Sequence, residues 1–153
     1  MRVLAADYGD ARTGVAISDM TGTLVGETTV VPSYSADKAA DAIAALCREK
    51  GVERIVVGRP LNMNGTAGER AEKAAAFAAL LSERTGLPAD LWDERLTTVD
   101  ANRILSDAGK KRGRQRARVD AVAASLILEG YLARHAAVQR AAPAVRQRAT
   151  PDF

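Results

Sequence analysis

Three stretches of the sequence place carboxylates where each would be costly to bury alone. Asp7 ends the apolar run 3–6, Asp93 and Glu94 end a short strand-like segment, and Asp120 opens an apolar helical pattern. A buried acid needs a partner, and carboxylates that converge on one site repel each other unless cations lie between them. Hard cations such as Mg²⁺ prefer carboxylate oxygens. Two such ions about 3.5–4 Å apart can activate water and stabilise the leaving oxygen of a phosphodiester. The pattern therefore indicates metal-dependent phosphodiester hydrolysis.

Each acid also has an explanation that needs no metal. Asp7 would cap a tight turn at the end of its strand. Asp93 or Glu94 would form a solvent-exposed ion-pair corner with Arg95, and Asp120, in the first turn of a helix, would favour the helix dipole. Because side chains alternate along a strand, only one of Asp93 and Glu94 is expected to face Asp7.

The first third of the chain predicts a sheet that would position Asp7. Alternating and β-branched residues indicate strands over 2–8, 14–18 and 23–31. Short turns between them give an antiparallel meander, which Pro32 ends. Apolar residues at helical spacing then predict a helix over 37–50.

The rest of the chain alternates strands and helices. The apolar run 55–57 is typical of a buried parallel strand reached by a helical crossover, and capping-box spacing of Thr66 and Glu69 predicts a helix over 69–85. The remaining predicted elements are a strand over 89–93, helices over 97–108 and 119–132, and a basic connection at 109–113. This order predicts an α/β fold with a five-stranded mixed sheet, an antiparallel meander plus two parallel strands, flanked by helices. Active sites of such sheets collect at the carboxyl ends of the strands.

Polar residues near these strand ends could hold a nucleic-acid backbone. Asn62 and Asn64 lie between a predicted strand and a helix, where backbone amides attract phosphate and Asn side chains bond phosphate or ribose. A turn and a helix cap would explain the same loop without a ligand. Arg12 and Arg95 would hold substrate phosphate or have only a structural role, and Arg95 could also orient the acids.

Residues 110–118 carry six positive charges and no acid, which leaves −3 on the rest of the chain. An ordinary solvated loop would explain this run, but its lack of acids and its position directly before Asp120 favour phosphate contact. Six phosphate contacts would give a salt slope of about −5 and a roughly thousandfold loss of affinity between about 50 and 200 mM salt. The predicted substrate-binding side chains of this run are Lys110, Lys111, Arg112, Arg114 and Arg116.

In their order and spacing these segments resemble the YqgF/RuvX family, once described as Holliday-junction resolvases. The matching motifs are Asp-x-Gly-x-x-Arg-x-Gly at 7–14, Gly-Arg-Pro-Leu-Asn-Met-Asn-Gly at 58–65, Asp-Glu-Arg-Leu-Thr-Thr at 93–98, and Val-Asp followed by Ala-Ala and Ile-Leu over 119–128. Each motif is weak alone, but the combination is highly specific.

The resemblance implies a ribonuclease-H-like fold in which Asp7, Glu94 and Asp120 are catalytic acids that bind Mg²⁺ or Mn²⁺, with two ions expected. It further implies a nuclease that acts in 5′-end maturation of pre-16S rRNA. Branched DNA is the older substrate assignment, which came from similarity to RuvC, and remains an alternative.

Composition limits the other possibilities. The 153 residues predict one domain over 1–135, followed by a flexible basic tail over 136–153. Aromatic residues make up 4% of the chain, which weakens any model built on an aromatic stacking platform. The single cysteine, Cys47, is expected to pack as a small apolar residue. With no signal-peptide or transmembrane pattern, we expect a cytoplasmic protein that does not bind membranes, as a monomer or homodimer.

Two other functions remain open at this point. A non-catalytic nucleic-acid-binding factor of ribosome assembly would keep the fold and the basic segment, but it has no need of three acids facing phosphates. An ATP-using phosphotransferase shares the Asp-x-Gly turn, but such proteins need two domains of this kind and 153 residues supply one.

Overall fold

A five-stranded mixed sheet forms the centre of the computed structural model, which describes residues 1–96 and 114–141. The strands are β1 (Val3–Asp7), β2 (Arg12–Ser18), β3 (Val25–Pro32), β4 (Arg54–Arg59) and β5 (Ala89–Asp93). They lie in the order β3-β2-β1-β4-β5, with β1–β2 and β2–β3 antiparallel and β1–β4 and β4–β5 parallel. The predicted mixed sheet is confirmed. Since β1, β3, β4 and β5 run in the same direction, their carboxyl ends lie along one edge, here called the carboxyl edge.

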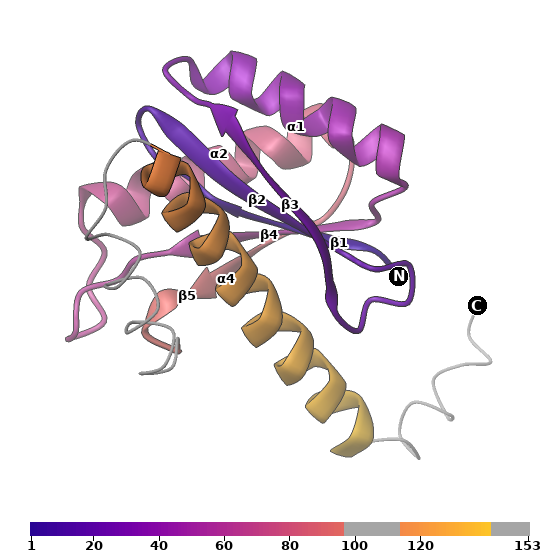
Figure 1. Ribbon diagram of the computed structural model, residues 1–153. Helices are drawn as coiled ribbons and strands as arrows, with labels where there is room; N and C mark the ends of the chain where they lie inside the picture. Colours follow the sequence, from indigo (N-terminus) through magenta and orange to yellow (C-terminus); the bar gives the residue numbers. More distant parts are fainter. Residues whose placement is uncertain (97–113, 142–153) are drawn as a thin grey trace.

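Helices cover both faces of the sheet (Figure 1). On one face pack α1 (Ala36–Lys50) and α2 (Glu69–Thr85), and on the other packs α4 (Arg114–Ala141). Alternation along β1 sends Leu4 and Ala6 into the core beneath α1 and α2, and Val3 and Ala5 into the core beneath α4. Asp7, two residues after Ala5, therefore belongs to the α4 face.

Local sequence explains where α1 begins and ends. The Ser35 hydroxyl accepts a hydrogen bond from the Lys38 backbone N–H, and Gly51 adopts a left-handed φ of 67° directly after the last turn. Cys47 is 4% exposed within this core, as predicted. Burial raises the pKa of its thiol to about 11, so the thiol is not reactive.

Several predicted boundaries differ from the structure. Pro32 is the last residue of β3 rather than the residue after it, which an edge strand tolerates because the missing N–H faces away from the ladder. The capping box of Thr66 and Glu69 is wrong: α2 begins after Gly68, with no side-chain cap. The predicted helix 119–132 is part of α4, which continues to Ala141 and past the sheet (Figure 1).

The helix expected over 97–108, the basic connection at 109–113 and residues 142–153 of the predicted tail lie outside the described residues, whereas residues 136–141 of that tail are the end of α4. No helix within the described residues combines the length and apolar character that crossing a bilayer requires.

Candidate active site

Asp7 ends the central strand β1 between two glycines on the neighbouring strands. On β2 it pairs directly with Gly14. On β4 the register pairs Ala6 with Val57, which places Gly58 beside Asp7 one step further. Neighbouring strands are about 4.8 Å apart. Asp7 is therefore flanked on both sides by backbone that carries no side chain, and both gaps open toward the α4 face.

Glu94 lies over the gap at Gly58. A Cβ atom added to Gly58 would come within 2.9 Å of Glu94 Oε2 and within 2.5 Å of Ile127 Cδ1 on α4. Glu94 belongs to η1 (Glu94–Leu96), the turn that follows β5. The missing side chain at Gly58 therefore lets the Glu94 carboxylate sit above β4, the strand next to Asp7.

Asp120 lies over the gap at Gly14. A Cβ atom added to Gly14 would overlap the Asp120 carbonyl oxygen, so the backbone of α4 rests directly on β2 at this point. The Asp120 side chain is not free: Arg12 Nε donates a hydrogen bond to its Oδ2 at 2.8 Å. Arg12, predicted as a substrate ligand, is thus placed as the partner of an acid.

The three acids influence one another electrostatically. Burial raises the pKa of Asp7 to about 6; Arg70 opposes this shift and Asp120 adds to it. Burial also raises the pKa of Glu94 to about 7, with a further contribution from Asp7 and opposition from Arg70. Carboxyl groups that titrate near neutrality at the end of buried strands are typical of functional sites.

Arg70 is a residue that the sequence interpretation missed. It lies in the first turn of α2, is exposed, and is the cation that lowers the pKa of both Asp7 and Glu94. Its position one turn beyond the 58–65 motif is the signal that could have identified it. An exposed cation in electrostatic range of the acids suits contact with a phosphate that approaches them.

The donor set at this place fits hard divalent cations. Three carboxylates, without thiol or imidazole, are the ligands that Mg²⁺ and Mn²⁺ prefer, and the raised pKa values show a local need for positive charge. The carboxylates are too far apart in this structure to share an ion: within residues 1–96 and 114–141, no three acidic, histidine or cysteine side chains are close enough together to hold one. The partner of Asp120 in this arrangement is Arg12.

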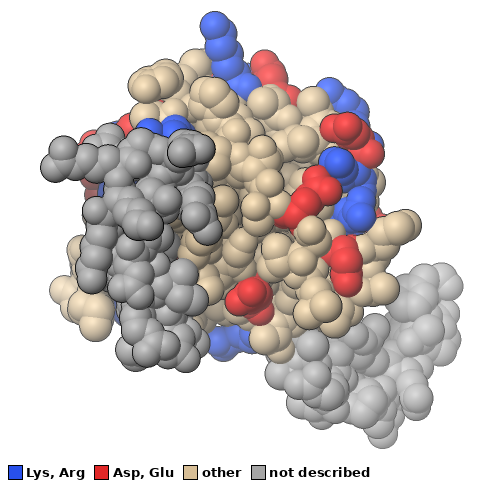
Figure 2. Space-filling model, in the orientation of Figure 1, with Lys and Arg blue, Asp and Glu red and all other residues tan. Residues whose placement is uncertain are grey.

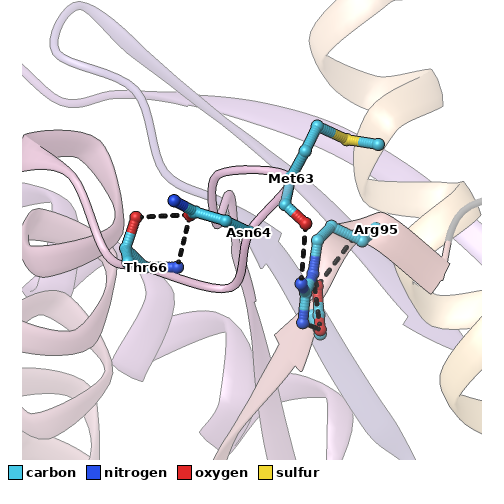
Figure 3. A network of polar contacts seen from close by, with 5 residues as sticks. Met63, Asn64, Thr66 and Arg95 are labelled. Atoms are coloured by element: carbon cyan, nitrogen blue, oxygen red, sulfur yellow. Dashed lines mark hydrogen bonds and ion pairs between the residues drawn. The ribbon is translucent and has the colours of Figure 1, made fainter.

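Asp93 and Arg95 form the ion-pair corner that was the alternative explanation for this segment. Arg95 donates to both Asp93 oxygens, with Nη2 2.6 Å from Oδ2 and Nε 3.0 Å from Oδ1. Asp93 thus fits the ion-pair interpretation of this segment, and Glu94 is the acid that faces the Asp7 site. Arg95 Nη1 also donates to the Met63 carbonyl at 3.4 Å, which joins β5 to the loop after β4 (Figure 3).

The same loop satisfies its own polar side chains. Asn64 Oδ1 accepts from the Thr66 backbone N–H at 3.1 Å and from the Thr66 hydroxyl at 2.7 Å (Figure 3). Asn62 Nδ2 donates to the same hydroxyl at 2.9 Å. This network is the turn that was the alternative to phosphate binding, although it leaves Asn62 Oδ1 and Asn64 Nδ2 outside these bonds.

The basic segment can be placed only in part. Arg114 and Arg116 fall in the first turns of α4, whereas Lys110, Lys111 and Arg112 lie outside the described residues. Across the coloured part of Figure 2, side chains of both signs are interspersed among uncharged ones, and no extended basic patch is visible. The assignment of residues 110–118 to phosphate binding stays a prediction.

The fold that carries these acids at its carboxyl edge is ribonuclease-H-like. The structure of Thermus thermophilus RuvC in complex with a Holliday junction substrate has the same fold, with a TM-score of 0.54, 18% identity, and coverage of 89% of this chain and 96% of that chain. The chain belongs to the RuvX family, whose model, described as Holliday junction resolvase, matches residues 1–134. The resemblance stated from the motifs is confirmed.

Curated relatives match over nearly their full length. A Moorella thermoacetica protein named "Putative pre-16S rRNA nuclease" is 48% identical over 136 residues, which cover 88% of this chain and 96% of the relative. A Clostridium novyi protein of the same name is 44% identical over 132 residues, which cover 86% of this chain and 98% of the relative.

Proposed function

We propose that this protein is a divalent-metal-dependent nuclease that hydrolyses phosphodiester bonds of pre-16S rRNA during 5′-end maturation in the cytoplasm. The observation that carries the proposal is the arrangement of Asp7, Glu94 and Asp120 over three adjacent strands. Two strands beside Asp7 have glycine at the level of the acid, and an acid-bearing segment lies over each glycine. The names of the relatives support the RNA substrate.

The acids have distinct roles in this proposal. Asp7, the most central, would bridge the metal ions, and Glu94 and Asp120 would complete the ligand set. Bound Mg²⁺ or Mn²⁺ would supply an activated water and would stabilise the charge that develops on the leaving oxygen. Arg12, whose Nε holds the Asp120 carboxylate, would keep that ligand oriented and would offer its remaining N–H groups to the substrate backbone.

Cations around the acids would position the phosphate. Arg70 approaches from the start of α2, and Arg12 from the start of β2. Arg95 would act through Asp93 and the Met63 carbonyl, by holding the loop that carries Asn62 and Asn64. The segment from Lys110 to Arg116 would add contacts that position a backbone without reading its sequence.

A four-way DNA junction is the second candidate substrate, favoured by the description of the family model. The two are separated by incubating a labelled pre-16S rRNA 5′ leader and a labelled four-way junction with Mg²⁺ or Mn²⁺. The proteins compared are wild type, Asp7→Asn, and the control Glu49→Gln, which changes an exposed acid near the far end of α1.

Metal-dependent cleavage of the RNA alone, lost in Asp7→Asn and kept in Glu49→Gln, is the expected result. Cleavage of the DNA junction alone would show that the substrate is branched DNA and not RNA, and would leave the metal-dependent mechanism in place. Salt-sensitive RNA binding without cleavage of either substrate, by wild type at every metal concentration, would reject the nuclease in favour of an assembly factor.

A further inference from the structure

A cavity of about 250 Å³ opens at the carboxyl edge, on the sheet face covered by α1 and α2. Its floor is aromatic: the rings of Tyr8 and Phe77 stack with centroids 4.2 Å apart and planes 18° from parallel. Pockets for drug-sized ligands measure roughly 300–1,000 Å³, so this volume suits one small, flat group. Asp10, Ala36, Lys73 and Ala76 also line the cavity.

Tyr34 lies two residues before Ala36, which lines this cavity, and its side chain is in solvent. It is 85% exposed, and it makes no hydrogen bond or ring contact within the described residues. The other described aromatic residues all contact a second ring: Tyr8 stacks on Phe77, and Trp92 meets Tyr131 edge to face. In a chain with few aromatics, an exposed and unpaired tyrosine at the carboxyl edge calls for an explanation.

The backbone of Tyr34 is held rigidly on both sides. Ser33 is 1% exposed; its N–H donates to the Ala11 carbonyl at 2.9 Å and its hydroxyl donates to the Gly9 carbonyl. These two carbonyls bracket Asp10, a cavity residue. Ser35 caps α1, and Ala36, the first residue of that helix, lines the cavity. The backbone that carries the phenol is therefore held in place two residues from a cavity-lining residue, which lowers the entropy lost when the phenol binds a ligand.

A polar pair lies at the same cavity. Lys73 Nζ is 3.3 Å from Asp10 Oδ1, with side chains 45% and 82% exposed, and it also lies 3.4 Å from Glu69 Oε1 one turn earlier in α2. Such a pair offers a cation for phosphate and a carboxylate for donor groups of a base edge. Aromatic faces together with hydrogen-bonding groups are the means by which proteins hold unpaired bases.

We propose that Tyr34 and this cavity form a subsite for one unpaired nucleobase of the substrate strand. Consecutive residues connect the subsite to the acids: Asp7 faces α4 and Tyr8 lines the cavity on the opposite face. A strand cut at Asp7 would cross the carboxyl edge and place a neighbouring base against the aromatic floor. The inference rests on the proposed function and deepens it, because it requires single-stranded nucleic acid at this point.

Binding in EDTA separates this inference from cleavage. Fluorescence anisotropy is measured for the full-length protein with a labelled single-stranded RNA dodecamer and with dodecamers that carry one abasic nucleotide at successive positions. For wild type, an abasic nucleotide at one position, or at two adjacent ones, is expected to weaken binding by about 5- to 150-fold, the range for loss of one base–aromatic stack. Equal binding of all the dodecamers would overturn the proposal.

Two variants identify the residues. Tyr34→Ala should weaken binding of the intact dodecamer by a similar factor and abolish the positional effect, whereas Tyr34→Phe, which keeps the ring, should bind as wild type does. Ala76→Leu fills the cavity from an exposed position of α2 and should act like Tyr34→Ala; Ala79→Leu, exposed on the same helix and outside the cavity, is its matched control. Wild-type binding by both Tyr34→Ala and Ala76→Leu would overturn the proposal.

Further outcomes remain distinct. If Tyr34→Ala fails to fold, the abasic series on wild type and the Ala76→Leu pair still decide. Sedimentation that shows a dimer dissociated by Ala76→Leu would assign the cavity to a second copy and overturn the nucleobase subsite. If one abasic position weakens binding but the protein cleaves neither substrate, only the proposed nuclease activity is rejected. If the protein cleaves but all dodecamers bind equally, only the nucleobase subsite is rejected.

Discussion

Arg12 and Asp120 are 108 positions apart in the sequence, and their side chains meet with Arg12 Nε donating to Asp120 Oδ2 at 2.8 Å. The bond joins the start of β2 to the first described turns of α4. It also decides where the Asp120 carboxylate points. The orientation of one proposed metal ligand is therefore set by a residue far from it in the sequence.

Arg12→Ala is expected to lower the cleavage rate by about 10- to 100-fold, the usual effect of removing the partner of a ligating group. The free energy of unfolding should change by less than about 1 kcal/mol, because both side chains of the pair are partly exposed. Arg12→Lys keeps the charge without the planar guanidinium, and its cleavage rate should fall between those of wild type and Arg12→Ala. Single-turnover cleavage and urea unfolding measure the two effects, and full activity of Arg12→Ala would contradict the role.

Gly58→Ala is expected to displace Glu94, because the new Cβ would lie 2.9 Å from its carboxylate and 2.5 Å from Ile127 Cδ1. Overpacking of this kind typically costs about 1–3 kcal/mol, and cleavage should fall further than stability alone explains. Gly68→Ala is the matched control, since its Cβ would meet nothing closer than 3.9 Å. Thermal unfolding and cleavage are compared for both variants; equal activity would show that Glu94 does not depend on Gly58.

The metal-free protein is expected to lose stability as the pH rises from about 4 to about 7. In this window folded Asp7 and Glu94, with pKa values raised to about 6 and about 7, keep protons that their unfolded counterparts have released. Their stabilising contribution is complete below the unfolded pKa and is lost as the pH passes the folded pKa. Asp7→Asn and Glu94→Gln should flatten this dependence and raise the melting temperature in EDTA at pH 8.

Divalent metal should reverse this trend in wild type, because Mn²⁺ binds the deprotonated carboxylates and stabilises the folded state more strongly at higher pH. Melting curves in EDTA and in Mn²⁺ between pH 5 and pH 8 test both statements. A metal-induced stabilisation that persists in Asp7→Asn would place the ion elsewhere.

Arg70→Ala is expected to move the acidic limb of the cleavage-versus-pH profile to higher pH. Arg70 lowers the pKa of both Asp7 and Glu94, so both should take up protons more readily without it. Arg70→Lys keeps the charge and should keep the profile. A profile unchanged in Arg70→Ala, with weaker RNA binding alone, would restrict Arg70 to substrate contact.

Much of the fold could be predicted because its signals are local. The helix over 69–85 and the strand over 89–93 match α2 and β5, since glycines and apolar spacing act within a few residues of the chain. Asp7 was recognisable for the same reason, as an acid at the end of an apolar strand. What the local pattern could not decide was the partner of each polar residue: Thr66, for example, bonds Asn64 instead of capping α2.

By itself, the sequence determined the types and order of the elements, the acids that end them, and the motifs that indicate the family. Only the tertiary structure decided that Gly14 and Gly58 flank Asp7, that Asp120 pairs with Arg12, and that Tyr8 and Phe77 line one cavity. These relationships depend on strand register and on how α4 and α2 pack, which arise from contacts between residues far apart in the chain. Periodicity along the chain reports which face a residue occupies, but not which distant residue it meets there.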